Sequence, residues 1–430
     1  MNGFGSVSGP GKPPLCFTAE TCPFISRKGT VDAMAGTHEE AHNIFPQIYF
    51  GSLLAAGLLL FLLHRRWGAL PKPGERFYDV IILVLGLWCL GGLLIDAFAH
   101  IGGRVDDTFF TEWHAVWYSG ATAYGAYIFY AVMPEGGVGE MLRRPFGVLS
   151  DIAPEHRPGV WGIIVFFISG FGDMIWHETL GVESSLDILL SPTHIGLFAG
   201  LILSVTGPFW SAWADPKSGR SGLRSQALPI FGLGAAWCVV LLMVRYAHPW
   251  IDGIGEYCYT PVYDYLCWNS DYNEALGIGM RSFLLQAALT AGILLMFLRR
   301  WEPAPGALAL LLGFHALGAW VYAEFDRDVA VMGIAWALLV EALRFMWTKG
   351  WRASFVSTAV ALQGVVLQVA LFISGPRGTW WEGTDLHVAP FGWTVHATFG
   401  AVVLCAFVGV MATTLAFPPS LPDMSETEQA

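Results

Sequence analysis

The sequence predicts an all-α, polytopic membrane protein with about eleven transmembrane helices. Of its 430 residues, 54% are apolar and only 13% are charged, whereas a soluble globular protein carries about 25% charged residues. Runs of about 20 mostly apolar residues recur along the chain, and each run is long enough to cross a bilayer as a helix. The composition therefore excludes a soluble enzyme, a disordered chain and a disulfide-rich scaffold.

Apolar spans account for most of the chain, and charged segments separate them. In chain order, the spans are expected at 47–64, 78–98, 114–133, 159–178, 193–212, 226–247, 277–298, 303–322, 329–347, 353–374 and 391–417. They divide the chain into an amino-terminal tail, two helical halves and a carboxyl-terminal tail, at 1–46, 47–215, 216–417 and 418–430. The first 46 residues lack a basic start followed by an apolar core, so we expect no cleavable signal peptide.

The basic residues between the spans gather on one side of the expected bundle. Because cytoplasmic loops carry an excess of Lys and Arg, we expect this side to face the cytoplasm of a bacterial cell. The tail at 1–46 then lies outside the cell, and the tail at 418–430 lies inside it. The basic residues on this side are Arg65, Arg66, Lys72, Arg76, Arg143, Arg144, Arg157, Lys217, Arg220, Arg224, Arg299, Arg300, Arg344, Lys349 and Arg352.

The net charge and the cysteines restrict the partners and the compartment. A formal net charge of −11 gives no support for nucleic-acid binding. Two pairs of cysteines, Cys16 with Cys22 and Cys258 with Cys267, lie in polar segments that the expected orientation places outside. Each pair could form a disulfide there, because that compartment is oxidising. The other cysteines lie in apolar runs and are expected to be small buried hydrophobes; they are Cys89, Cys238 and Cys405.

A duplicated pattern of ionisable residues stands out in the first half. Each copy has Asp-x3-His at the end of one span, then a short loop, then Ser/Thr-x2-His at the start of the next span. A glycine follows the last histidine by six residues in both copies. The first copy is Asp96, His100, Thr111, His114 and Gly120, and the second is Asp173, His177, Ser191, His194 and Gly200.

Helix geometry brings the ligating side chains of each copy together. Residues four positions apart lie on one helix face, so the aspartate and the first histidine converge. The loop reverses the chain and brings the second histidine to the same membrane depth. Each copy then forms a triad of one carboxylate and two imidazoles, a set that suits copper, zinc or iron, and spacing alone does not choose among them. Ionisable side chains within spans are costly, so a repeated triad indicates metal binding.

At these residues the chain resembles the C subunit of the copper-containing membrane monooxygenases, which oxidise methane, ammonia or short hydrocarbons. The first motif of that family is Asp-x3-His followed by Phe-Thr-x2-His, matched here from Asp96 to His114. The second is Asn-x3-His, an acidic loop and Pro-x-His, matched here from Asp173 to His194. The resemblance covers residues 78–215, about a third of the chain.

The resemblance implies copper at both triads and oxidation of a small apolar substrate with O2. It also implies an electron donor such as quinol, additional monooxygenase-like subunits and an oligomeric assembly. The chain departs from the family at Asp173, where the family has Asn, and six further spans follow the matched region. Nothing in the sequence resembles the periplasmic copper-binding domain that accompanies the family's subunit.

Two other functions fit the same residues. In a zinc-dependent intramembrane lipid hydrolase, a metal-bound water with a pKa near ~7 attacks an ester or amide, and Ser119, Ser191 or Thr193 could assist. In a non-catalytic subunit or a metal transporter, the triads bind ions without chemistry. Few charges besides Glu341 and Arg344 lie in the inner halves of the spans, which counts against transport.

Four further histidines, His248, His315, His387 and His396, are expected at the level of the triads or above them. They could complete the metal sites, form a third site or relay protons. The segment 38–42 matches His-Glu-x2-His, the zinc motif of metalloproteases. A charged surface helix explains this segment equally well.

Overall fold

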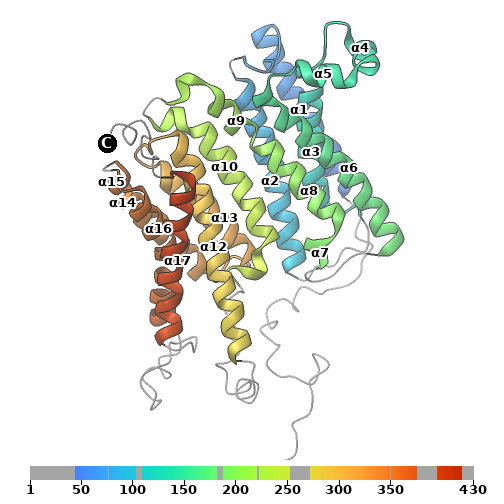
Figure 1. The fold of residues 1–430 in the computed structure, drawn as a ribbon. Coiled ribbons are helices and arrows are strands. Elements are labelled where there is room, and N and C mark those ends of the chain that lie inside the picture. The colour runs from blue at the N-terminus through green and yellow to red at the C-terminus, as the bar shows by residue number, and fades with distance from the viewer. Residues whose placement is uncertain are drawn as a thin grey trace, which may run out of the picture. The chain divides into compact units, whose positions relative to one another are not determined.

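The structure is a computed structural model that describes residues 44–75, 77–102, 109–181, 187–219, 222–251, 272–348, 350–374 and 395–418. These residues form helices and connections without β-strands, which confirms the all-α prediction (Figure 1). The chain from Ile44 onward forms one compact unit. Several predicted features lie outside the described residues, namely the two cysteine pairs, the segment 38–42 and His387.

Nine spans among the described residues are long and apolar enough to cross a membrane, which confirms a multi-pass membrane protein. Their helices are α1 (Phe45–Trp67), α2 (Tyr78–Ile101), α6 (Arg157–Leu180), α8 (Pro192–Val205) with α9 (Gly207–Ala214), α10 (Leu223–Met243), α12 (Tyr272–Arg300), α14 (Arg327–Ala342) with α15 (Arg344–Thr348), α16 (Arg352–Ser374) and α17 (Val395–Ala416). Two further expected spans correspond to α3 (Glu112–Ala131), which is 20 residues long, and α13 (Ala307–Tyr322), which is 16. The count of eleven spans stays a prediction.

Short helices complete the described chain. They are α4 (Gly137–Arg143), α5 (Pro145–Asp151), α7 (Asp187–Leu190) and the 3-10 turns η2 (Pro154–His156), η3 (Pro216–Gly219) and η4 (Arg245–Ala247).

The span expected at 193–212 is broken into α8 and α9 at Thr206. Proline has no backbone N–H, so Pro208 cannot donate to the carbonyl oxygen of Ser204, four residues earlier. The hydroxyl of Tyr124 on α3 donates to this oxygen instead, over 3.0 Å. This hydrogen bond joins the end of α8 to α3.

The span expected at 303–322 begins as a helix only at Ala307, after two prolines and a glycine. The carboxylate of Glu341 on α14 accepts hydrogen bonds from the backbone amides of Gly306 and Leu308. It also forms an ion pair with Arg344 over 3.1 Å. A carboxylate at a helix N-terminus satisfies amides that lack partners within the helix, so these charges position α13.

The two copies of the repeat form equivalent helix pairs, α2 with α3 and α6 with α8. The glycine six residues after each second histidine lies at a close approach of the two helices. A Cβ atom on Gly120 would lie 3.0 Å from the backbone nitrogen of Cys89, and one on Gly200 would lie 2.7 Å from that of Phe166. Small residues allow helix backbones to approach in this way, so these glycines belong to the packing of each pair.

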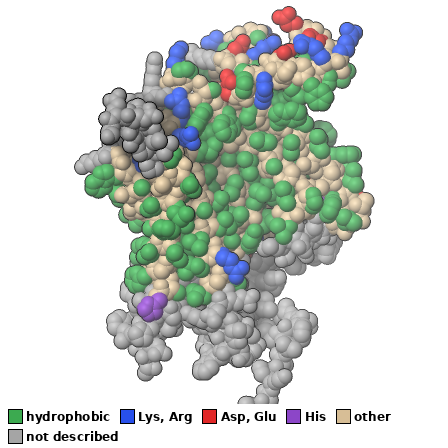
Figure 2. Space-filling model, viewed as in Figure 1, with side chains coloured by type: hydrophobic (Ala, Val, Ile, Leu, Met, Phe, Trp, Pro, Cys, Tyr) green, Lys and Arg blue, Asp and Glu red, His purple; other side chains and the backbone are tan. Residues whose placement is uncertain are grey.

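Side chains are distributed as expected for a protein that contacts lipid. Figure 2 shows hydrophobic side chains over most of the visible face, and Lys and Arg side chains mainly along its upper edge. Large apolar residues are exposed along several helices, including Leu54, Leu58, Ile168, Phe407 and Leu415. Cys89, Cys238 and Cys405 are buried and free, as predicted.

Candidate metal centre

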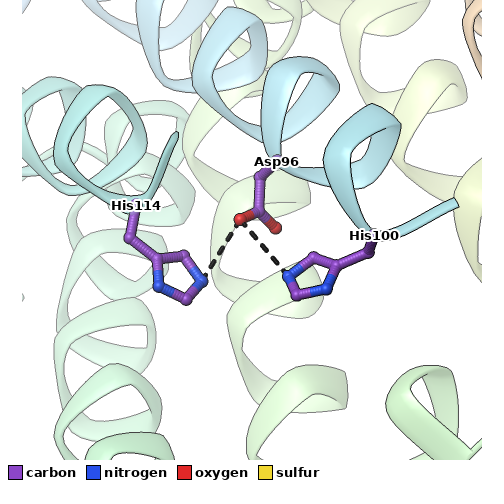
Figure 3. Close-up of side chains that lie close together, drawn as sticks. All are labelled: Asp96, His100 and His114. Atoms are coloured by element: carbon purple, nitrogen blue, oxygen red, sulfur yellow. Dashed lines mark ion pairs between the residues drawn. The ribbon is translucent and has the colours of Figure 1, made fainter. Parts of the chain in front are cut away.

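The first triad joins the end of α2 to the start of α3 (Figure 3). Asp96 and His100 lie in the last turns of α2, and His114 lies in the first turn of α3. The Oδ1 atom of Asp96 is 3.2 Å from His114 Nε2 and 3.7 Å from His100 Nε2. Asp96 therefore lies between the two imidazoles, as the spacing predicts.

A backbone carbonyl fixes the tautomer of His114. Its Nδ1 atom lies 2.7 Å from the carbonyl oxygen of Phe109. Because a carbonyl oxygen only accepts, Nδ1 must carry the proton. In the neutral ring, Nε2 then presents a lone pair to the carboxylate of Asp96. Two acceptor atoms at this distance need a positive charge between them, either a proton or a metal ion.

The second triad joins the end of α6 to the start of α8. Asp173 and His177 lie near the end of α6, and His194 lies in the first turn of α8. Here the two carboxylate oxygens face different rings: Oδ2 of Asp173 is 3.4 Å from His177 Nε2, and Oδ1 is 3.6 Å from His194 Nε2. All six predicted ligands thus converge in two groups.

Two hydroxyl groups link the ligands of the second triad. Thr193 donates its only hydroxyl proton to Oδ1 of Asp173 over 2.7 Å. At its contact with Ser191, 3.2 Å away, Thr193 must therefore accept. Ser191 must then accept from Nδ1 of His194, which lies 2.6 Å from its oxygen. This chain places the proton of His194 on Nδ1 and directs the Nε2 lone pair into the triad.

The Ser/Thr-x2-His part of each motif also starts a helix. The side chains of Thr111 and Ser191 accept hydrogen bonds from the backbone amides of His114 and His194, over 3.4 and 3.3 Å. Serine and threonine are preferred at the N-cap because they satisfy such amides. The cap therefore holds each second histidine in the first helical turn, where it faces the preceding helix.

The separations of the ligand atoms fit a small transition-metal ion. The ligand atoms within each triad all lie within 4.8 Å of one another. Tetrahedral bonds of about 2.0–2.1 Å, typical of Zn²⁺ with histidine, put neighbouring ligand atoms about 3.4 Å apart. The Asp–His separations of 3.2 and 3.7 Å in one triad and 3.4 and 3.6 Å in the other agree with that value. Nitrogen and oxygen donors suit copper, zinc and iron alike.

Burial makes an uncompensated charge at these positions expensive. Asp96 is 7% exposed and Asp173 only 1%. Isolated carboxylates are rarely ionised in such surroundings unless a cation or hydrogen bonds compensate them. Two imidazoles around each carboxylate provide ligands for such a cation.

One cavity of about 290 Å³ connects the two triads. Asp96 and His100 of the first triad and His194 of the second line it, together with the rings of Trp117 and Phe198. Its volume lies near the lower limit of ligand pockets, about 300–1,000 Å³. A small molecule in this cavity would reach ligands of both triads.

The sequence did not indicate which other residues line the cavity, or which groups hydrogen-bond to the ligands of the triads. Leu242, Arg245 and Tyr246 also line the cavity, although they belong to the second half of the chain. The carbonyl of Phe109 orients His114, and a backbone carbonyl leaves no signal in a motif. Thr193, considered above only as a catalytic aid, supports the carboxylate of Asp173 instead.

The candidate histidines outside the triads that the structure describes, His248, His315 and His396, do not join them. His248 and His315 are buried, and their Nε2 atoms lie 3.1 Å apart. The backbone amide of Trp250 donates to Nδ1 of His248, so His248 carries its proton on Nε2 and donates to His315. A ring with this tautomer cannot bind a metal through Nε2. His396 is exposed on α17.

Ser119, also considered as a catalytic aid, donates to the carbonyl of Val116 within α3 and is buried. Among the residues that the structure describes, the two triads are the groups of three or more His, Cys, Asp or Glu side chains that could hold a metal ion.

Comparisons with protein-family models, with curated proteins and with solved structures found no match to this chain. The resemblance to the copper monooxygenase subunit therefore stays a prediction that rests on the two motifs.

Proposed function

We propose that this protein is a membrane metalloenzyme, a copper-dependent monooxygenase or a subunit of one, that oxidises a small apolar substrate with O2. Each triad holds one metal ion, and zinc or iron could occupy the same ligands. The substrate occupies the cavity that the two triads share.

One observation carries this proposal more than any other. His114 presents the Nε2 lone pair to the Asp96 carboxylate over 3.2 Å, because Phe109 already holds its Nδ1 proton. Such a contact is favourable only around a cation. The second triad repeats the ligand set with a different support for its ring, from Ser191, and the repetition favours a bound metal over a locally shared proton.

The residues of the chain orient the ligands. Copper, when bound, supplies the redox chemistry that activates O2. The described lining of the cavity is mainly apolar, with Leu93, Trp117 and Phe198 among its members, so it admits an apolar substrate from the bilayer. One oxygen atom enters a C–H or N–H bond, and the other leaves as water, with electrons from an external donor such as quinol and protons from solvent.

The membrane context is part of the same proposal. The positive-inside rule puts the triads near the outer face of a bacterial cytoplasmic membrane, with the amino terminus outside and the carboxyl terminus in the cytoplasm. Additional monooxygenase-like subunits, or further copies of this chain, would complete the enzyme.

Metal analysis of the purified full-length protein tests the proposal. We expect about one copper ion per triad, or about two per chain, and O2 uptake that depends on an apolar substrate. His100→Ala and His177→Ala should each remove about half of the bound metal. His396→Ala removes an exposed histidine on another helix, so this control should retain all of it.

The alternative outcomes are distinct. Zinc in the triads with hydrolysis of lipid esters or amides would replace the proposal by a hydrolase. Bound metal without either reaction would favour a non-catalytic subunit or a transporter. Full metal retention in both histidine variants would overturn the ligand assignment itself.

A further inference from the structure

A second large cavity lies in the membrane-spanning region, away from the triads. It has a volume of about 520 Å³ and lies between α1 and α2. Leu59 and Leu63 form part of one wall, and Val84 and Trp88 form part of the other. The residues of α1 that line it recur every three or four positions, so one face of α1 is turned toward this slot.

The slot exists because α1 is attached to α3 rather than pressed against α2. Near the start of α1, Tyr49 shares a hydrogen bond of 2.8 Å with Thr122 of α3. Beyond its end, the hydroxyl of Tyr127 on α3 donates to the carbonyl of Pro71 over 2.8 Å. These anchors hold α1 at both ends, and none of its residues is buried.

An aromatic pair lines one end of the slot, and basic residues follow in the sequence of α1. The rings of Trp67 and Phe77 stack with centroids 5.4 Å apart, and both residues line the slot. Arg66 follows Leu63 by three residues and Leu59 by seven, so it extends the same face of α1. Arg65 and Arg66 are exposed at this end.

This arrangement combines an apolar slot with positive charge where the slot meets the membrane surface. We propose that it binds one anionic phospholipid, with an acyl chain in the slot and the phosphate against Arg66. The guanidinium of Arg65 lies over the ring of Phe61, outside the lining, and adds positive charge at the same end of α1. Basic clusters at the ends of transmembrane helices attract anionic lipids, and the slot lies within the range of ligand pockets. In the connection between the helices, the charges of Lys72, Glu75 and Arg76 sum to one further positive charge, which adds to that of the two arginines of α1.

Native mass spectrometry on the full-length protein tests the site. The protein is reconstituted in vesicles of equal parts phosphatidylglycerol and phosphatidylethanolamine and then extracted in mild detergent. We expect one phosphatidylglycerol retained per chain. Replacing both arginines by glutamine should lower this retention about tenfold, because each basic residue near the surface contributes to anionic-lipid attraction.

A second variant tests the slot independently of the charges. Ala56 lines the slot, so Ala56→Trp should fill it and remove the retained lipid. Two controls should leave retention unchanged: Arg143→Gln, a basic residue on α4, and Leu58→Trp, on a lipid-exposed part of α1 outside the lining. Thermal unfolding of each variant shows whether it is folded.

Three results would overturn the proposal. One is equal retention of the two lipids by the unmodified protein. Another is retention that neither the arginine pair nor Ala56→Trp alters. The third is retention of a neutral lipophilic molecule in place of phosphatidylglycerol.

Discussion

The two triads share their ligands but differ in what holds those ligands in place. In the first triad, one oxygen of Asp96 faces both imidazoles, and a backbone carbonyl orients His114. In the second, each oxygen of Asp173 faces a different ring, and the hydroxyls of Ser191 and Thr193 link the carboxylate to His194. The two copies therefore share their candidate ligand atoms and differ in the contacts that support them.

This difference indicates that the two sites are not interchangeable. A backbone carbonyl accepts a hydrogen bond but cannot donate one, so it fixes the tautomer of His114. The hydroxyl chain of the second triad also has a single direction, because the carboxylate of Asp173 only accepts, so it places the proton of His194 on Nδ1. Unlike the carbonyl of Phe109, this support consists of side chains, so it can be removed by substitution.

The largest expected effect is loss of metal when a ligating carboxylate is neutralised. Asp96→Asn and Asp173→Asn keep the shape of the side chain and remove its negative charge. Each variant should lower the metal affinity of its own triad by more than about 100-fold, beyond what loss of an outer hydrogen-bond partner costs. Metal titration of the purified variants measures both affinities.

The same pair of variants tests whether the triads act separately. Each one should leave the metal content of the other triad unchanged. Simultaneous loss of both ions in either variant would show that the triads bind metal as one unit, and would remove the basis of the comparison.

A smaller effect should follow from removing the hydroxyl that supports Asp173. Thr193→Val keeps the branched shape and deletes the 2.7 Å hydrogen bond. Because outer partners of metal ligands contribute about 10–100-fold to affinity, the second triad should weaken by that amount while the first is unaffected. Thr358→Val deletes a hydroxyl bonded to a backbone carbonyl on α16, and this control should leave the affinity unchanged in the same titration.

The smallest expected effects distinguish two roles of Thr111 and Ser191, namely capping the helix and orienting the imidazole of the following histidine. Thr111→Ala and Ser191→Ala each remove an N-cap, and each should cost about 1 kcal/mol of stability, measured by denaturant unfolding. Ser191 alone also contacts Nδ1 of the following histidine. Ser191→Ala should therefore lower metal affinity in the second triad, by less than about tenfold because water can replace the hydroxyl. An equal loss of affinity in Thr111→Ala would contradict this division of roles.

Which parts of the site the sequence could predict depends on how far apart in the sequence the interacting residues lie. Asp96 and His100 converge because of helical periodicity, and Asp173 and His177 converge for the same reason, so short spacings were sufficient. The break of a span at Thr206 could not be predicted in this way. It depends on the hydrogen bond from Tyr124 to the carbonyl of Ser204, which is a contact between two helices.

The same reason explains what the sequence left out of the site. Arg245 and Tyr246 enter the cavity from a turn more than 130 residues after His114. No local pattern specifies that approach, because it depends on how α10 packs against α2 and α8. The contact of His114 with the carbonyl of Phe109 could not be predicted either, because every residue has a backbone carbonyl and no motif marks this one.

The most direct test of the two-triad account is a structure of the metal-loaded protein with anomalous scattering recorded at the absorption edge of the bound metal. The account predicts one anomalous peak in each triad, about 2.0–2.2 Å from the facing Nε2 and carboxylate oxygen atoms. Triads without anomalous density in a protein that retains its metal elsewhere would contradict it.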